Sequence, residues 1–245
     1  HGLFGVLIVE PEGATWTDPE TGAPLIDGLY ADVHPVDGCS FREYAIFFHD
    51  EVEIHPLKES GHHDPGMDSD AQADPMHGGH DQGGGGTGTH ADNADPHVMP
   101  ISYRSEPMHH RVSEFGETQH HSSWLFGDPA TPVLHAYRND PTKIRLVHAG
   151  VKETHVFHLH VHQWFTVPDD ANSPLLDSVS ISPQTGMTIE PLYGAGSRQG
   201  AIGDVIWHCH LYPHFHRGMW GMWRVHDVLE TGQYPDGRPR LYPDG

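Results

Sequence analysis

The chain has 245 residues, with 34 acidic residues against 13 basic ones and a formal net charge of -21 at pH 7. A surface with this charge repels nucleic acids and anionic membranes, so neither is an expected partner. No apolar run approaches the ~18 residues that a transmembrane helix needs, so no membrane span is predicted. The scarcity of lysine beside abundant aspartate favours saline surroundings, where salt screens self-repulsion. The alternative is an acidic secreted protein whose histidines offset part of the charge in mild acid.

The sequence predicts an all-β protein. Short apolar segments are separated by Gly, Pro, Asn and Asp, as strands are by turns. The expected strands are, in chain order, residues 3–9, 42–48, 132–137, 143–148, 156–167, 178–181, 187–191, 205–210 and 220–226. Strands of this length and spacing favour a Greek-key β-sandwich.

Residues 59–100 interrupt this pattern. The stretch is rich in His, Gly and Asp, and hydrophobic residues are almost absent. It is therefore predicted to be a mobile surface insertion that adds nothing to a core. Its histidines, interleaved with Asp and Met, suit transient capture of copper or manganese ions. A solvated linker without a role in metal binding is the alternative.

The run His208-Cys209-His210 carries the strongest chemical signal and ends a predicted strand. Side chains on a strand alternate between faces, so Cys209 points one way while His208 and His210 point the other. His214 and Met219 follow shortly after. Two histidines, a thiolate and a weak axial methionine are the ligands of a blue copper site. One copper site is therefore expected on the cysteine face and a second on the histidine face.

The segment from residue 155 to residue 162 has a complementary pattern. His158 and His160 share one face of a strand, whereas His155 has the opposite parity. His155 can therefore join the cysteine-side site, and the other two can join the histidine-side site. Two strands that divide their ligands in matching ways predict two adjacent metal sites. His162 and His216 lie beyond these positions and are expected to have supporting or surface roles.

Both runs resemble motifs of the multicopper oxidases. The third motif of that family is H-x-x-H-x-H and its fourth is H-C-H-x-x-x-H-x-x-x-[GA]-[ML], and this chain contains both in full and in order. The resemblance is good over about residues 120–228 and looser before them. It implies a cupredoxin fold, copper as the cofactor, and O2 and a reducing substrate as partners.

The resemblance also assigns roles to the motif residues. It implies that type 1 copper is held by His155, Cys209 and His214 with Met219 axial, type 2 copper by His158, and the type 3 pair by His160, His208 and His210. Electrons from a donor would then pass from the type 1 copper through Cys209 to His208 and His210. These three residues are the expected catalytic relay to the cluster at which O2 is reduced to water.

The resemblance further implies that part of the copper cluster lies outside this chain. A trinuclear cluster in the family uses eight histidines, and the two motifs supply four of them. The others are expected from another cupredoxin domain, earlier in the same polypeptide or on a partner chain. Residues 1–10 resemble the last strand of such a domain. A linker at 11–40, a copper-binding domain at 41–229 and a second linker at 230–245 complete the expected organisation, that of an internal piece of a longer secreted protein, extracellular or periplasmic.

Three functions remain open. The first is oxidation of a metal ion such as Mn(II) or Cu(I), favoured by the acidic composition and the insertion. The second is laccase-like oxidation of phenols or other organic reductants. The third is a copper-binding or nitrite-reductase-type cupredoxin without oxidase activity, although such a protein has no use for both imidazoles that flank Cys209.

The remaining signals have plainer interpretations. Cys39 has no partner once Cys209 is assigned to copper, and it is expected to be buried or half-buried. Four tryptophans are expected to pack in the core and form walls of the sites, namely Trp164, Trp207, Trp220 and Trp223. Structural hydrogen bonding is expected of the other histidines of the strands, which are His34, His135, His148 and His226.

Overall fold

The computed structural model describes residues 3–50, 52–53, 97–109, 111–112, 116, 119 and 121–227. All of them belong to one compact unit, which is formed by residues 1–53 and 97–245. The second unit, Ile54–Pro96, lies outside the described residues, as do most of the predicted insertion and the linker at 230–245.

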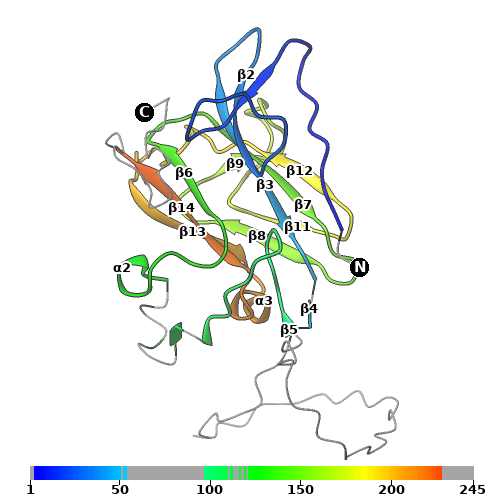
Figure 1. Ribbon diagram of the computed structural model, residues 1–245, viewed down its shortest axis with the longest axis vertical. Helices are drawn as coiled ribbons and strands as arrows, with labels where there is room; N and C mark the ends of the chain where they lie inside the picture. The colour runs from blue at the N-terminus through cyan, green and yellow to red at the C-terminus, as the bar shows by residue number, and fades with distance from the viewer. Residues whose placement is uncertain are drawn as a thin grey trace, which may run out of the picture. The chain divides into compact units, whose positions relative to one another are not determined.

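The described residues form a β-sandwich of two five-stranded sheets (Figure 1). The first sheet contains, in order, β1 (Thr15–Thr17), β2 (Tyr30–His34), β3 (Phe41–Phe48), β7 (Thr142–His148) and β12 (Gly186–Ile189). The second contains β11 (Ser178–Ile181), β8 (His155–Leu159), β13 (Gly203–Cys209), β14 (Trp220–His226) and β6 (Val133–Tyr137). Two pairs, β3 with β7 and β14 with β6, are parallel, and the other pairs are antiparallel.

Two small pairings and two short helices complete the unit. Strand β4 (Val52–Glu53) pairs with β5 (His97–Val98), and β9 (Trp164–Phe165) pairs with β10 (Leu175–Leu176). The helices are α2 (Ser123–Phe126) and α3 (Tyr212–His216). The chain alternates between the sheets from β6 to β7 to β8, and again from β11 to β12 to β13. This Greek-key, all-β sandwich confirms the predicted fold class.

Alternation along the strands gives each sheet a buried inner face. In β13, Val205, Trp207 and Cys209 are buried, whereas Ile206 and His208 are half-buried on the opposite face. The inner faces of both sheets contribute to one core cluster. Burial of each large apolar side chain contributes about 1.5–3 kcal/mol. Because a shift of one residue would expose this entire set, the core fixes the direction in which Cys209 points.

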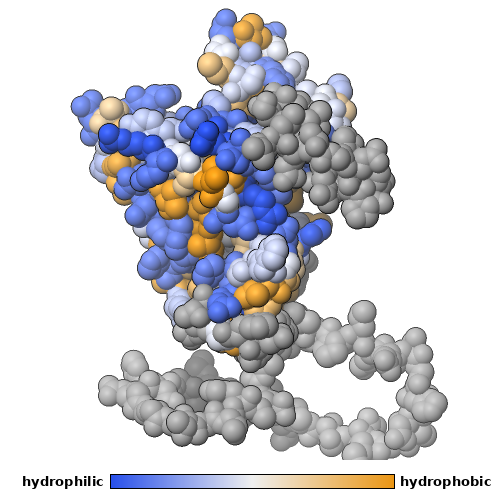
Figure 2. Space-filling model, turned by 90° about the vertical axis from the view of Figure 1, so that its left-hand side faces the viewer, coloured by the Kyte–Doolittle hydropathy of each residue, from blue (hydrophilic) through white to orange (hydrophobic). Residues whose placement is uncertain are grey.

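The outer face of the second sheet has a smaller cluster of its own, formed by Met108, Trp220 and Met222. The buried guanidinium of Arg111 lies 5.2 Å from the ring centroids of both Trp220 and Phe126. Arg111 also forms an ion pair with Glu106. These contacts hold Glu106, Arg111 and Phe126 against the outer face. On the side of the molecule shown in Figure 2, hydrophilic side chains predominate and hydrophobic ones form separate patches.

The structure differs from the predicted strands and boundaries in four places. Residues 3–9 form no strand, since no neighbouring strand pairs with them among the described residues. The predicted linker at 11–40 contains β1 and β2, which extend the first sheet. The predicted strand at 156–167 is broken after Leu159. The end of the predicted insertion is packed, because Val98 and Met99 are buried. None of the described helices is long and apolar enough to cross a membrane.

Candidate metal centre

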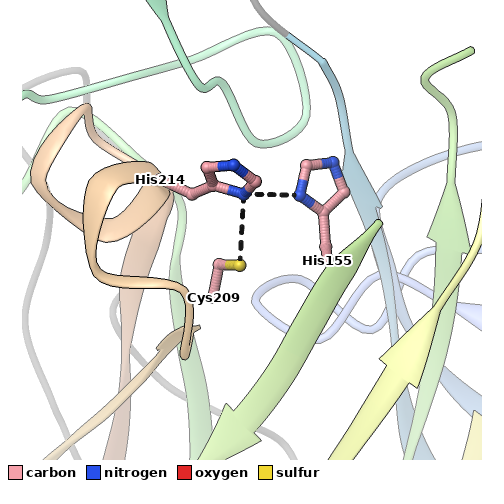
Figure 3. Close-up of side chains that lie close together, drawn as sticks. All are labelled: His155, Cys209 and His214. Carbon is pink, nitrogen blue, oxygen red and sulfur yellow. Dashed lines mark hydrogen bonds between the residues drawn. The ribbon is translucent and has the colours of Figure 1, made fainter. Parts of the chain in front are cut away.

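Three donor atoms converge where β8 begins and β13 ends. The two strands are antiparallel neighbours, so His155 at the start of β8 and Cys209 at the end of β13 lie at the same end of the second sheet. Helix α3 follows β13 and brings back His214 (Figure 3). The His155 Nδ1 atom lies 3.1 Å from His214 Nδ1, which lies 3.6 Å from Cys209 Sγ. All three side chains are buried.

Backbone hydrogen bonds fix the segment that carries these ligands. The N–H of Cys209 donates to the carbonyl of Met219 at 3.0 Å, and the N–H of Met219 donates to the carbonyl of His214 at 3.0 Å. Pro213, near the start of α3, favours the turn because its fixed φ suits the first helical residues. Met219 is fully buried, in the same core cluster as Cys209. The four residues predicted for a type 1 site are thus brought into one buried region.

The donor set fits a metal ion. Imidazole nitrogen and thiolate sulfur bind zinc at about 2.0–2.3 Å, so with similar bond lengths the donors of a trigonal site lie roughly 3.5–4 Å apart. The separations of 3.1 and 3.6 Å between His155, His214 and Cys209 approach this arrangement. Two imidazoles and one thiolate in a trigonal set, with a methionine nearby, select copper.

The second group of histidines lies on the opposite face of the same two strands. His208 and His158 are directly paired across β13 and β8, and their ring centroids are 5.4 Å apart. The Nε2 atoms of His160 and His208 are 3.1 Å apart, and the ring of His210 lies 5.3 Å from that of His158. All four predicted histidines therefore cluster. His160 and His210 are exposed, so one side of this cluster is open.

A strained turn separates the two neighbouring histidines His160 and His162. The N–H of His162 donates to the carbonyl of His160 at 2.7 Å, and Val161 between them has a φ of 69°. This is a γ-turn of the rare, strained kind, and a β-branched residue at positive φ is an outlier. His162 is buried, stacks on Trp223 and accepts a hydrogen bond from the N–H of Gly196. The Nδ1 atom of His162 also lies 2.9 Å from the carbonyl oxygen of His160, so His162 contacts the turn that follows this predicted ligand.

Burial favours the neutral form of three of these imidazoles, those of His155, His160 and His208. The pKa of His155 is lowered to about 3, first by burial and then by the neighbouring His148 and His214. Burial also lowers the pKa of His208 to about 4 and that of His160 below its usual value. Neutral imidazoles have a free nitrogen lone pair, which is the form that binds a metal.

The thiol of Cys209 must lose its proton to bind a metal, whereas a neutral imidazole already has a free lone pair. Burial raises the pKa of the thiol, although backbone N–H groups of Val156 and Leu211 act in the other direction. The Val156 N–H lies 3.4 Å from the sulfur. A metal ion displaces the thiol proton, so binding at this site is coupled to proton release.

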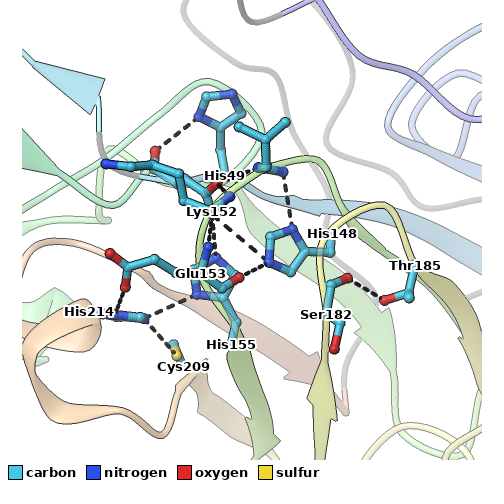
Figure 4. Close-up of polar contacts among 12 residues, drawn as sticks. His49, His148, Lys152, Glu153, His155, Ser182, Thr185, Cys209 and His214 are labelled. Carbon is cyan, nitrogen blue, oxygen red and sulfur yellow. Dashed lines mark hydrogen bonds and ion pairs between the residues drawn. The ribbon is translucent and has the colours of Figure 1, made fainter.

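Three further residues surround His155 and His214, and the sequence analysis did not connect them with the metal. The Glu153 carboxylate lies 2.9 Å from His214 Nε2 (Figure 4). The buried Asp50 carboxylate lies 3.4 Å from His155 Nε2. His148 is stacked on His155 and accepts a hydrogen bond from the N–H of Gly150. Glu153 stands two residues before a ligand, but Asp50 is about a hundred residues away and offered no signal.

Three of the four histidines predicted to be structural, His34, His135 and His226, lie away from both groups, whereas His148 stacks on His155. His34 is hydrogen bonded to Thr17 and Ser40, and His135 is hydrogen bonded to His226 at 3.0 Å. Cys39 is exposed, which corrects its predicted burial, because it lies in a polar loop between β2 and β3.

Comparison with known proteins identifies the family of the chain. A multicopper oxidase family model matches residues 102–228, just over half of the chain. No curated protein matches the chain by sequence.

Solved structures that resemble the chain include three copper proteins. A multicopper oxidase is 16% identical, with a TM-score of 0.33 and coverage of 40% of this chain and 36% of that one. A multicopper oxidase from Campylobacter jejuni described as a metallo-oxidase is 17% identical, with a TM-score of 0.30 and coverage of 38% and 20%. Copper nitrite reductase from Nitrosomonas europaea is 21% identical, with a TM-score of 0.34 and coverage of 46% and 38%.

The chain therefore spans well under half the length of these proteins, and likeness at this level carries no argument about activity. The family model and both complete motifs define the class. The chain belongs to the multicopper oxidase family, its fold is a cupredoxin β-sandwich, and its cofactor is copper.

Proposed function

We propose that this chain is the part of a multicopper oxidase that accepts electrons at a type 1 copper and passes them to a trinuclear copper cluster. One observation carries the proposal. Cys209 and His208 are adjacent in β13 but point to opposite faces, and each joins a separate group of metal-ligand atoms. The two groups are therefore connected through the few covalent bonds between neighbouring residues, which is a short route for electrons.

The residues of each group have distinct roles in the proposal. His155, Cys209 and His214 hold the type 1 copper, with Met219 as the axial ligand. On the opposite face, His158 binds the type 2 copper, and His160, His208 and His210 bind the type 3 pair. With copper bound, one-electron oxidations of the donor supply the four-electron reduction of O2 to water. The open side of the histidine cluster is completed by four histidines from the remainder of the polypeptide or from a partner chain.

We further propose that the donor is a metal ion such as Mn(II) or Cu(I). The Glu153 carboxylate lies 2.9 Å from Nε2 of His214, which is the most exposed of the three type 1 ligands. Because the Glu153 side chain is itself 36% exposed, it places a negative charge where the site is nearest to solvent. A carboxylate attracts a cation but offers a neutral phenol no comparable charge interaction. The charge of -21 supports the same choice. We also propose an extracellular or periplasmic location, which rests on the acidic composition.

Replacing one imidazole on the cluster face tests the oxidase assignment. His208→Ala should keep the blue thiolate-to-copper absorption and lose O2 consumption, because the relay is interrupted after Cys209. His34→Ala is the matched control, since His34 is also half-buried but lies far from both groups in the fold. O2 consumption by His208→Ala at the parent rate would contradict the oxidase assignment. Nitrite reduction by the parent protein without O2 consumption would favour the nitrite-reductase-type alternative.

A neutral isostere at Glu153 tests the donor. Glu153→Gln should lower kcat/KM for Mn(II) or Cu(I) roughly tenfold, equivalent to about 1.4 kcal/mol, because one charge interaction is lost. The rate with a phenolic dye should stay unchanged. Glu190→Gln is the matched control, because Glu190 directly follows β12 and forms an ion pair with Lys143. An equal fall with the dye would instead support the laccase-like alternative.

A further inference from the structure

Asp50 is the buried carboxylate that the proposed function leaves without a role. Asp50 follows β3 and is 4% exposed. Its carboxylate accepts hydrogen bonds from the backbone N–H groups of Val151, Lys152 and Glu153. These donors lie in the loop that connects β7, the neighbour of β3 in the first sheet, with β8 of the second sheet. Burial alone would raise the pKa of Asp50, but the three N–H donors hold it below its usual value. The three N–H donors directed at its oxygens match a carboxylate, which only accepts hydrogen bonds.

The loop is shaped around this carboxylate. A Cβ atom at Gly150 would lie 2.2 Å from Asp50 Oδ1 and 2.6 Å from Oδ2, closer than any side chain tolerates. Since the φ of Gly150 lies outside the left-handed region, close approach is what requires glycine here. Glycine at position 150 thus lets the Asp50 carboxylate contact the N–H groups of the three residues that follow Gly150.

The same carboxylate faces the free nitrogen of a proposed copper ligand. His155 presents Nδ1 to His214, at 3.1 Å, so its proton belongs on Nε2 when Nδ1 binds a metal. Nε2 is buried without a hydrogen bond of good geometry, and the acceptor within reach is Asp50 Oδ1 at 3.4 Å. The Nε2 atom of His148, whose ring stacks on that of His155, lies 3.9 Å from the same oxygen.

We propose that Asp50 is a positioning residue for both histidines of the type 1 site. It accepts a hydrogen bond from the Nε2–H of His155 and so fixes the tautomer and the ring orientation that direct Nδ1 toward Cys209. By binding the loop N–H groups it also holds Glu153 against His214. The type 1 identity of the metal rests on the proposed function, but the tautomer and the loop anchoring do not.

The variant Asp50→Asn tests both parts, because asparagine keeps the shape, removes the charge and puts an N–H donor where acceptors are needed. In the metal-free protein, 15N NMR should show His155 as the Nε2-protonated tautomer in the parent and as a mixture in the variant. With Cu(II) added, the affinity read from the thiolate absorption should fall about 10–100-fold, as when partners of metal-bound histidines are lost. Gly150→Ala should have the same two effects by pushing the loop from Asp50.

Asp32→Asn is the matched control. Asp32 is also buried, at 2% exposed, but its partner is Arg42 in the first sheet. The control should lower the unfolding midpoint without changing the His155 tautomer or the copper affinity. An unchanged tautomer and affinity in Asp50→Asn would overturn the inference, as would equal losses in Asp32→Asn. If the parent protein shows no thiolate absorption with copper, the proposed function fails, whereas the tautomer measurement still decides the role of Asp50.

Discussion

Gly221→Ala should destabilise the protein because the new methyl group would meet Trp207 in the core beside the cysteine. Gly221 pairs with Trp207 across β14 and β13. A Cβ atom there would lie 2.3 Å from Cζ2 and 2.7 Å from Cε2 of the Trp207 ring. That ring is 1% exposed and cannot yield without moving β13, which carries Cys209 two residues further on.

The magnitude follows from two opposing effects. Inserting a methyl group into a packed core costs about 1–3 kcal/mol. Replacing glycine returns roughly 0.5–1 kcal/mol by restricting the unfolded chain. The expected net loss in the free energy of unfolding is therefore about 1–2 kcal/mol, and the strain on β13 should also broaden the copper absorption.

Urea unfolding with the same slope and a lower midpoint is the measurement. Gly186→Ala in β12 is the control, since its Cβ would lie 3.6 Å from the nearest atom, the Leu146 carbonyl oxygen. The control should unfold within about 0.5 kcal/mol of the parent. Equal midpoints for Gly221→Ala and the parent would refute the packing argument at Trp207.

Three further outcomes are expected. Val161→Gly should leave the free energy of unfolding unchanged or raise it by up to about 1 kcal/mol, because the strain of valine at positive φ is relieved and outweighs the extra chain entropy that glycine gives the unfolded state. A decrease of more than about 1 kcal/mol in urea unfolding would show that the turn is not strained. For the metal-free protein, stability should fall as the pH drops from about 6.5 toward 4, because the unfolded chain binds protons that buried histidines with lowered pKa values do not. His135, whose pKa burial lowers to about 4, contributes up to about 1.4 kcal/mol per pH unit, so His135→Gln should flatten the decline, and a parallel pH profile would contradict this. Replacing residues 59–96 by a short linker should cost little stability, because Glu53 and His97, on either side of the segment, are paired in β4 and β5. The rate of Mn(II) and Cu(I) oxidation should fall while the rate with a phenolic dye stays constant. Equal rates on all three substrates would show that the segment is only a spacer.

The ligand groups could be predicted from the sequence because strand parity is a local property. His155 and Cys209 point inward and His158 and His208 point outward, as alternation requires. The break of the predicted strand after Leu159 was not foreseeable, since Val161 is a residue that favours strands and rarely adopts a positive φ.

Other features depend on contacts between distant segments. Asp50 approaches His155 because β3 and β7 pair in parallel, which places the end of β3 beside the loop that precedes β8. Strands β1 and β2 are short and lie among Pro, Gly and Asp, so composition alone indicated a linker. Their strand conformation comes from pairing, since β2 pairs with β3 and β1 pairs with β2.

Replacing the sulfur of Cys209 tests the proposed type 1 copper site. Cys209→Ser should abolish the intense blue absorption of the copper-loaded protein, because a hydroxyl oxygen cannot supply the thiolate charge-transfer transition, and oxidase turnover should be lost with it. Cys39→Ser removes the other, exposed cysteine and should keep the parent spectrum and rate. Blue absorption that persists in Cys209→Ser, or that disappears in Cys39→Ser, would contradict the account.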